Sequence, residues 1–444
     1  MTSVLPKKHD PLFTLFPPQL SANTAGHGFA HDRLALDEAG RDYVLYLAIP
    51  FCRVRCHACP YFNELLSPRD PLDKEERYVS ALLEDLRQWA SYTRFRTGRL
   101  RAIYLGGGTG SIFSTANIKR IVDTIFALFP VAHDYELTLE GNAHDYNKTK
   151  LDFVADSQVT RVSLGVQSFD PYILKTIGSP HAADESTRVI SELGARGFHN
   201  VQLDMMYNLP GQDRETWQRD LNRLDALNIS HFTIYLYRIH QNSPQHRFIQ
   251  IGKVPAILPK ESENVRQMYD DVIDAAASMG FQNYMFDYFA KPGYQSEYNN
   301  WSLRNASSES LGVGPGAYGY INNHRYATGR NVENYIAAVH RGEHVITGVS
   351  EPVSLQAQKE RFIINLLQYF VVDLAHYRSA FGTDLTADFA SEIEVMSKRG
   401  LATLDEEKLT LTLLGKEWHR QRVAYQRTNS GINRELSRNG APPS

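Results

Sequence analysis

The sequence predicts an α/β protein in which parallel strands alternate with crossover helices. Two observations support this fold class. Six short apolar runs recur between residues 43 and 240, and segments with apolar residues at helical spacing separate them. Alternation of this kind favours parallel strands, arranged either as an open doubly wound sheet or as a barrel.

The predicted elements follow one another in a regular order. The strands are VLYLAIP (44–50), RAIYL (101–105), ELTLE (136–140), RVSLGV (161–166), NVQLDMMY (200–207) and HFTIYLY (231–237). The first helix begins near Asp73 and Glu76, because acidic residues are favoured in a first helical turn. A second helix covers IKRIVDTIFALF (118–129), and a later one places Trp217 on its apolar face.

Beyond about residue 256 the pattern changes. ESENVRQMYDDVIDAAASMGF predicts one amphipathic helix, and a segment rich in glycine and aromatic residues follows it. Helices and then a strand pair near the end indicate a small winged-helix-like domain. We therefore expect five parts, which are an N-terminal arm (1–42), a barrel (43–255), a barrel extension and linker (256–350), a C-terminal helical or winged domain (351–422) and a disordered polar tail (423–444).

Composition excludes some classes of partner. The 47 Lys and Arg residues against 50 Asp and Glu give a net charge of −3. This charge balance does not favour nucleic acid or an anionic membrane as a partner. The first residues, MTSVLPKKHDPLF, lack the apolar core of a signal peptide. No apolar run approaches the ~18 residues of a membrane span. We expect a cytoplasmic protein, in which clustered cysteines stay reduced.

All three cysteines, Cys52, Cys56 and Cys59, lie in CRVRCHACPYF (52–62), directly after the first predicted strand. In parallel α/β folds that end of the strands carries the active site. Three thiols are one short of a structural zinc site, and His57 would be crowded as the fourth ligand. Zinc and metal-free thiols stay open as alternatives. The spacing favours a cubane iron–sulfur cluster with one iron left open for a substrate or cofactor.

Further polar or glycine-rich positions end the following strands. LGGGTGS (105–111) is no phosphate loop, because no Gly-Lys-Ser/Thr follows, and its glycines have the wrong register for a dinucleotide fingerprint. Glycines there allow close approach of a ligand, although a tight turn also needs them. Glu140, Gln167 and Asp204 mark the next three strands, where an unpaired polar residue costs free energy. Each alone could be a structural partner, but their convergence favours a polar ligand.

Together these motifs resemble a known family. CxxxCxxC, GGGT, LE, SLGVQSF and LDMMYNLPGQ, in this order, are similar to the radical S-adenosylmethionine (SAM) enzymes. Within them the chain resembles the HemN-like family of oxygen-independent coproporphyrinogen III oxidase, through LGVGPGAYGY and over roughly residues 43–420. The resemblance implies a partial (β/α)6 radical SAM barrel with an N-terminal arm and a small C-terminal winged-helix-like domain. It also implies a [4Fe–4S] cluster and one or two SAM molecules.

The resemblance implies roles for individual residues. Cys52, Cys56 and Cys59 would hold the cluster, and the amino and carboxylate groups of SAM would bind its open iron. The other implied cofactor contacts are Tyr46, Ala58 (through its backbone), Gly107, Gly108, Thr109, Glu140, Gln167 and Asp204. A reduced flavodoxin or ferredoxin-type donor would supply the electron that cleaves SAM to methionine and a 5′-deoxyadenosyl radical.

Several positions depart from the family pattern. Ala48 and Tyr318 each replace a common His, Ala58 replaces an aromatic residue, Pro60 replaces a Gly, and Ser179 stands where an Arg is expected. The cofactor pocket is therefore expected to differ from that of a coproporphyrinogen oxidase. CRxRCxxCPYF, the chain length and AGHGFAHDR resemble the haem-utilisation members ChuW and HutW (anaerobilin synthases). These are radical SAM methyltransferases that open haem anaerobically to a linear tetrapyrrole and release iron.

Three functions stay open at this point. The first is the haem-degrading methyltransferase, with haem or another tetrapyrrole as substrate. The second is a porphyrinogen oxidase or a HemN-like methyltransferase with another aromatic substrate, and the third is a haem chaperone of the same family. Arg33, Arg53 and Arg55 are candidate anchors for substrate carboxylates, and His27 and His31 are candidate haem ligands. Exposed arginines and loop histidines are nevertheless more often bystanders.

Overall fold

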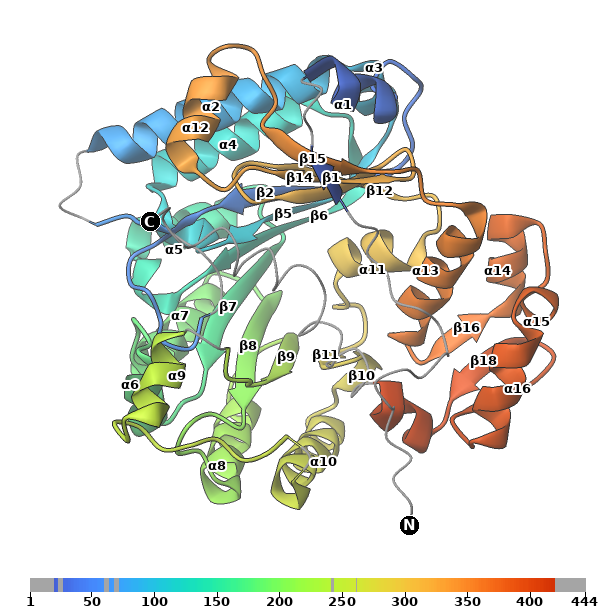
Figure 1. The fold of residues 1–444 in the computed structure, drawn as a ribbon. Helices are drawn as coiled ribbons and strands as arrows, with labels where there is room; N and C mark the ends of the chain where they lie inside the picture. Colours follow the sequence, from blue (N-terminus) through green and yellow to red (C-terminus); the bar gives the residue numbers. More distant parts are fainter. Residues whose placement is uncertain are drawn as a thin grey trace.

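A curved sheet forms the centre of the molecule, and six neighbouring strands of it are the parallel strands of the barrel (Figure 1). The computed structural model describes residues 20–22, 27–59, 64–67, 72–240, 243–260 and 262–419. The parallel strands are β2 (Tyr43–Ile49), β5 (Leu100–Gly107), β6 (Val131–Gly141), β7 (Arg161–Gln167), β8 (Val201–Tyr207) and β9 (His231–Leu236). They lie in the sheet in chain order, so the predicted α/β class with crossover helices is confirmed.

Helices cover the outer face of these strands. They are α2 (Leu72–Ser91), α3 (Thr93–Thr97), α4 (Thr115–Leu128), α5 (Lys148–Asp156), α6 (Pro171–Ile177), α7 (Ala183–Ala195), α8 (Arg214–Asp225) and α10 (Glu263–Ser278). Helix α9 (Pro244–Gln250) instead packs against His57 through Phe248. Ser114 caps α4 by accepting a hydrogen bond from the Asn117 backbone, and Asp213 caps α8 in the same way at Thr216. The helices predicted from apolar spacing at these positions are therefore present.

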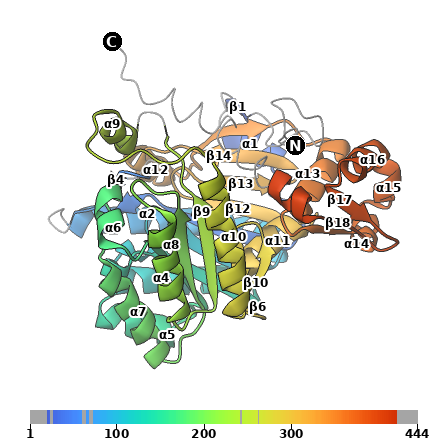
Figure 2. The ribbon, with the colours of Figure 1, turned by 90° about the horizontal axis from the view of Figure 1, so that it is seen from below.

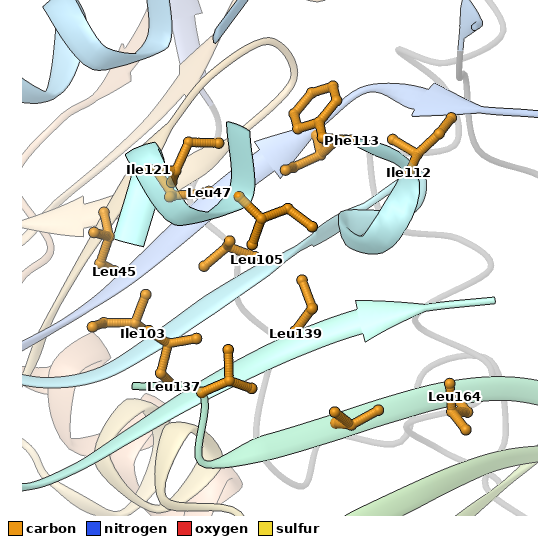
Figure 3. Close-up of a cluster of buried hydrophobic side chains, with 14 of the residues drawn as sticks. Leu45, Leu47, Ile103, Leu105, Ile112, Phe113, Ile121, Leu137, Leu139 and Leu164 are labelled. Carbon is orange, nitrogen blue, oxygen red and sulfur yellow. The ribbon is translucent and has the colours of Figure 1, made fainter. Parts of the chain in front are cut away.

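Successive residues of each strand face opposite sides of the sheet, so one set lies in the buried core and the other faces the barrel interior. Leu45, Leu47, Ile103, Leu105 and Ile121 of α4 belong to the buried core between strands and helices (Figure 3). The residues between them face the other side of the sheet. We define the barrel interior by one partly exposed residue of each strand on that side: Tyr46, Tyr104, Glu140, Gly165, Asp204 and Tyr235.

The sheet continues beyond both edges of the six parallel strands. Beside β2 lies β12 (Glu309–Val313), which also runs parallel to it. The antiparallel strands β13 (Tyr318–Ile321), β14 (His324–Thr328), β15 (Ile346–Ser350) and β1 (Leu20–Ala22) follow. Beside β9 lie β11 (Tyr288–Ala290) and β10 (Gln282–Met285). The sequence analysis did not identify these strands. Asn322 and Asn323 join β13 to β14 with positive φ angles of 48° and 57°, which matches the tight turn of a two-residue hairpin.

The C-terminal residues form a unit with its own hydrophobic core and a three-stranded sheet. Its elements are α13 (Leu355–Leu367), β16 (Val371–Asp373), α14 (Leu374–Phe381), α15 (Leu385–Asp388), α16 (Ala390–Lys398), β17 (Ala402–Leu404) and β18 (Lys408–Leu411). Figure 1 shows it beside α11 (Glu297–Arg304), away from α6 and α9. This arrangement agrees with the expected winged-helix-like domain, while the predicted tail (423–444) lies outside the described residues.

Four smaller elements are also part of the fold. The N-terminal arm contributes α1 (His27–Arg33), and α12 (Val332–Val339) packs on α2. The two-residue strands β3 (Phe51–Cys52) and β4 (Glu64–Leu65) pair in parallel just beyond β2. No helix in the described ranges is both long and apolar enough to cross a membrane.

A buried ion pair ties the segment before α11 to the barrel. Arg161 Nε donates to Glu136 Oε2 at 2.8 Å, and both side chains are almost fully buried. Glu136 also accepts hydrogen bonds from Ser296 Oγ and from the backbone amides of Glu297 and Tyr298. The carboxylate therefore caps the first turn of α11, where a negative charge is favoured.

Replacing Glu136 by Gln should destabilise the fold, because Arg161 would keep a buried charge without its partner. We expect a loss of about 3–5 kcal/mol in the free energy of unfolding, measured by urea denaturation. Glu333→Gln is the matched control, since Glu333 pairs with Arg77 on the exposed surface, where such pairs contribute about 0–1 kcal/mol. Equal losses in the two variants would contradict the anchoring role of Glu136.

Candidate functional site

The cysteine loop (52–59) begins where β2 ends. Cys52 closes β3, and its Cα partner across the parallel pair is Leu65 of β4. The backbone N–H of Cys59 donates to the carbonyl of Cys56 at 3.2 Å, which closes a turn between the second and third cysteines. All three thiols are partly buried and free of disulfides. The structure thus places them at the carboxyl end of the barrel strands, as the sequence predicted.

Burial and mutual proximity keep the Cys52 and Cys56 thiols protonated when no metal binds them. Burial raises the pKa of Cys52 to about 11 and that of Cys56 to about 12, and neighbouring cysteines add to both shifts. Metal binding needs thiolates and releases their protons, so this set of donors fits a cationic iron–sulfur cluster. No three His, Cys, Asp or Glu side chains of the described residues are arranged around a single metal ion. In a four-iron cluster each thiolate binds a different iron, so such an arrangement is not needed.

The glycine turn (106–110) packs backbone against backbone beneath the cysteine loop. Gly108 N donates to the Ile49 carbonyl at 2.8 Å, and a Cβ on Gly108 would lie 2.4 Å from the Phe51 carbonyl oxygen. A Cβ on Gly110 would lie 2.4 Å from the Leu105 carbonyl oxygen. Packing alone therefore requires these two glycines. Gly107 differs, because its positive φ of 113° is the feature that demands glycine there.

A chain of hydrogen bonds leads from the first cysteine to the end of β6. Thr109 Oγ1 donates to Cys52 Sγ at 3.5 Å, and Asn142 Nδ2 donates to Thr109 Oγ1 at 3.1 Å. Thr109 thus contacts the cysteine loop, and the cofactor contact that the resemblance implied for it stays a prediction. Asn142 was not predicted from the sequence, although it is a polar residue two positions after Glu140 at the same strand end.

Glu140 is a buried carboxyl group with one oxygen available. Its Oε2 accepts a hydrogen bond from the Gly107 amide at 3.1 Å, and Oε1 has no hydrogen-bond partner among the described residues. Burial raises the pKa of Glu140 to about 7, and the nearby charge of Asp204 contributes. A ligand ammonium or hydroxyl group that donates to Oε1 would favour the ionised form of Glu140 and so offset the free-energy cost of burying its charge.

Asp204 is held by neighbouring strands instead. Its carboxyl group accepts hydrogen bonds from Ser163 Oγ at 3.1 Å, Gln202 Nε2 at 3.0 Å and Thr233 Oγ1. Burial still raises its pKa, although these three bonds act in the opposite direction. The structure therefore gives Asp204 a clear role in the barrel, and any contact with SAM would come in addition to it.

Gln167 occupies a strained position at the end of β7. Its φ of 61° lies in the left-handed region, and the strand pairing shifts register between Gly165 and Gln167. A Cβ on Gly165 would lie 2.8 Å from Gln167 Nε2 and 3.6 Å from Asn142 Oδ1. The two amide side chains therefore converge over Gly165, inside the barrel. Strain of this kind is common at binding sites.

Tyr46 and Ala58 lie on different sides of the cysteine loop. The Tyr46 ring stacks on Tyr104 at 5.9 Å in the barrel interior, and a Cβ on Gly107 would lie 3.2 Å from its hydroxyl. Ala58 packs in a small apolar cluster with Leu174 of α6 and Tyr237. Because Tyr237 belongs to this cluster, a small residue at position 58 is accommodated where the family usually has an aromatic one.

Two of the arginine anchors suggested by the sequence are already engaged. Arg53 donates through Nε to Asp145 Oδ1 at 3.0 Å and through Nη2 to the Ile112 carbonyl at 3.2 Å. Asp145 is fully buried and also accepts from Ser111 Oγ. Arg33 donates to Glu351 at 2.8 Å. The suggestion that Arg33 and Arg53 are anchors waiting for a substrate is therefore corrected, and Arg55 alone stays exposed.

His31 lies at the opposite end of the barrel from the cysteines. Its ring packs at 5.3 Å against Tyr92, the residue that follows α2. This helix of 20 residues spans roughly 30 Å from the cysteine end to the amino end of the strands. His31 is thus too far away to ligate a haem beside the cluster, which corrects that suggestion. The side chain of His27 lies outside the described part of the chain.

The remaining departures from the family pattern change the polarity of the barrel mouth. Ser179 Oγ lies 3.2 Å from His181 Nδ1, in a turn next to His57. Tyr318 accepts a hydrogen bond from Arg330 Nη2 at 3.5 Å, and Arg325 lies over its ring. An arginine therefore stands beside Tyr318, whereas the position of the expected family arginine holds a hydroxyl group.

Comparisons with known proteins agree with this geometry. A model of the radical SAM superfamily matches residues 46–224. The haem chaperone HemW of Escherichia coli K12 is 30% identical over 279 residues, 62% of this chain and 70% of the chaperone. The anaerobilin synthase of Escherichia coli O157:H7 is 25% identical over 72% of this chain and 70% of the synthase. The solved structure of Escherichia coli coproporphyrinogen III oxidase (HemN) has a TM-score of 0.77 at 20% identity, covering 91% and 93% of the two chains, so the folds are alike.

Protein purified without oxygen should be brown and contain about four irons and four sulfides per chain, as expected for a cubane held by cysteines. Replacing Cys52, Cys56 or Cys59 by Ala should abolish the colour and the cleavage of SAM. Iron, sulfide and zinc analysis of each variant measures this. Stoichiometric zinc without sulfide, in protein from iron-replete cells, would refute the cluster.

Glu140→Gln should change how stability depends on pH in protein without cofactors. The folded pKa of about 7 lies above the ordinary value of 4.5, so Glu140 adds stability at low pH that is lost as pH rises through 7. The stability of the variant relative to the natural protein should therefore rise by about 2–3 kcal/mol between pH 4.5 and 8. Urea denaturation across that range measures it, and a difference that does not vary with pH would contradict the burial of Glu140.

Proposed function

The chain belongs to the HemN-like family of radical SAM proteins, and on that premise we propose that it is a haem-degrading methyltransferase. It would open the porphyrin ring without oxygen, add a methyl group from SAM and release iron with a linear tetrapyrrole. The anaerobilin synthase relative supports this proposal. So does the aromatic lining of the barrel interior beside the cysteine loop, which is the observation that carries it.

That lining consists of tyrosines that are partly exposed to the interior. The Tyr104 ring stacks on Tyr46 with centroids 5.9 Å apart and contacts the tilted ring of Tyr298 at 5.3 Å. The hydroxyl groups of Tyr235 and Tyr288 lie 3.4 Å apart. Aromatic faces of this kind pack well against a flat, unsaturated ring system. The six strand positions of the interior carry two carboxyl groups and no lysine or arginine, and Arg161, which faces the same side of β7, is paired with Glu136. The lack of an unpaired cation at these positions favours a flat macrocycle over a substrate that would place four carboxylates in the barrel interior.

A positive charge that can bind substrate carboxylates lies at the mouth of the barrel instead. Arg330 has no acidic partner among the described residues and reaches the Tyr318 hydroxyl group at 3.5 Å. A haem whose ring enters the interior can direct its two propionates toward this arginine. Arg330 would then take the place of the anchors that the sequence analysis sought in Arg33 and Arg53.

The cofactors of the family are a [4Fe–4S] cluster and SAM, which supply an electron, a radical and a methyl group when bound. The chain's own residues hold and orient them. Cys52, Cys56 and Cys59 provide the three thiolates, and Oε1 of Glu140 can accept a hydrogen bond from SAM. The three donors around Asp204 fix the direction of that carboxyl group before any ligand arrives.

A haem chaperone is the second candidate. The specific observation in its favour is the 30% identity with a protein named as a haem chaperone, against 25% with the synthase. A chaperone can use the same tyrosine lining to bind haem and then deliver it unchanged. A porphyrinogen oxidase is less well supported, because the likeness to HemN at 20% identity concerns the fold alone.

Anaerobic incubation with haem, reductant and SAM carrying a labelled methyl group distinguishes these functions. We expect a ring-opened tetrapyrrole that contains the label, together with free iron, S-adenosylhomocysteine, 5′-deoxyadenosine and methionine, all identified by mass spectrometry. Haem that stays intact and unlabelled after many equivalents of SAM are cleaved would refute the methyltransferase. Intact haem bound without SAM cleavage would favour the chaperone.

A further inference from the structure

Three segments around His57 carry positive charges and no acidic residue. They are the cysteine loop (52–59), the residues of α6 and its following turn (171–181), and the residues of α9 and its following loop (243–260). We call them together the basic rim. Its cations are Arg53, Arg55, Lys175, Arg247, Lys253 and Lys260. Such a one-sided distribution contrasts with the whole chain, whose net charge is −3.

Direct contacts hold the three segments together. His57 N donates to the Ile177 carbonyl of α6 at 2.9 Å, and Gln245 N donates to the His57 carbonyl at 3.3 Å. The His57 ring also packs edge-on against Phe248 of α9 at 4.8 Å. Figures 1 and 2 both show α6 and α9 together at one edge of the molecule. The basic rim is therefore one continuous surface beside the cysteines.

Most cations of the basic rim face solvent without an acidic partner. Arg55, Lys175, Arg247 and Lys253 are exposed, and none of them forms an ion pair with a described residue. Arg53 differs, since Asp145 holds it. Unneutralised charges of one sign create a potential that attracts an oppositely charged partner and speeds its association.

Exposed apolar side chains lie among these cations. Val54 is 46% exposed, Tyr172 56% and Ile251 65%, and Leu65, the strand partner of Cys52, is 50% exposed. Large apolar side chains gathered on a surface mark sites of contact with other proteins. Cations alone would suit a small anion, but cations mixed with apolar side chains fit a protein partner.

We propose that the basic rim is the docking surface for a small acidic electron-transfer protein with a flavin or iron–sulfur centre. This inference rests on the proposed function, because it needs a redox cluster on the three cysteines. One electron passes from the reduced carrier to the cluster, the carrier is oxidised by one electron, and no bond forms or breaks. Val54 and Arg55 lie between Cys52 and Cys56, so a docked carrier contacts the loop that holds the cluster. Electron-transfer complexes are small and weak, so a surface of this extent suffices.

The test compares two triple charge reversals in anaerobically reconstituted protein, with a flavodoxin as the probe. The rim variant is Lys175→Glu, Arg247→Glu and Lys253→Glu. The control variant is Arg87→Glu, Arg96→Glu and Lys408→Glu, which changes the same charge at exposed positions outside the rim. Flavodoxin affinity is measured by titration calorimetry at low salt and at 0.5 M salt. SAM cleavage is measured with reduced flavodoxin and, separately, with dithionite.

The rim variant should lose about tenfold or more in flavodoxin affinity at low salt, and the loss should shrink at high salt. Its flavodoxin-driven SAM cleavage should fall in parallel, while its dithionite-driven cleavage stays normal. Equal affinities of the rim and control variants would overturn the proposal, as would a rim variant that loses haem affinity and keeps flavodoxin affinity. If dithionite drives no SAM cleavage even in the natural protein, the proposed function fails. The flavodoxin affinities of the rim and control variants still test the docking surface in that case.

Discussion

The close packing of the glycine turn against β2 and β3 is the constraint on which the site depends. Gly108 lies so near the backbone of Ile49 and Phe51 that no side chain fits between them. The turn is thereby fixed beneath the cysteine loop. Thr109 Oγ1 can then donate a hydrogen bond to Cys52 Sγ, and the Gly107 amide donates one to Glu140 on the next strand. Three consecutive strand ends are brought together by this one contact between backbones.

The same strands build the core and the site because their side chains alternate. Leu105 and Leu139 are fully buried beneath the helices, whereas their neighbours Tyr104 and Glu140 face the barrel interior. The two glutamates of β6 have different environments. Glu136 is paired with Arg161 and with the start of α11, while one oxygen of Glu140 has no hydrogen-bond partner in the part of the chain that the structure describes. The first carboxylate serves the fold, and the second is available to a ligand.

The sequence allowed prediction of the six parallel strands, because each is an apolar run that ends at a polar or glycine-rich position. It also located the cysteines and Glu140 at one end of the barrel. The hairpin joined by Asn322 and Asn323 was missed because its strands are short and alternate in polarity, although the paired asparagines were a usable signal. The position of His31 could not be predicted, since only packing against Tyr92 reveals which end of the barrel it occupies.

The central claim is that the three cysteines hold a cluster whose open iron binds SAM at the glycine turn and Glu140. Electron paramagnetic resonance of the reduced cluster, with SAM enriched in ¹⁷O at its carboxylate, tests this claim most directly. Addition of SAM should change the spectrum, and ¹⁷O should broaden it relative to unlabelled SAM. A spectrum that SAM leaves unchanged, with no ¹⁷O broadening, would contradict the account.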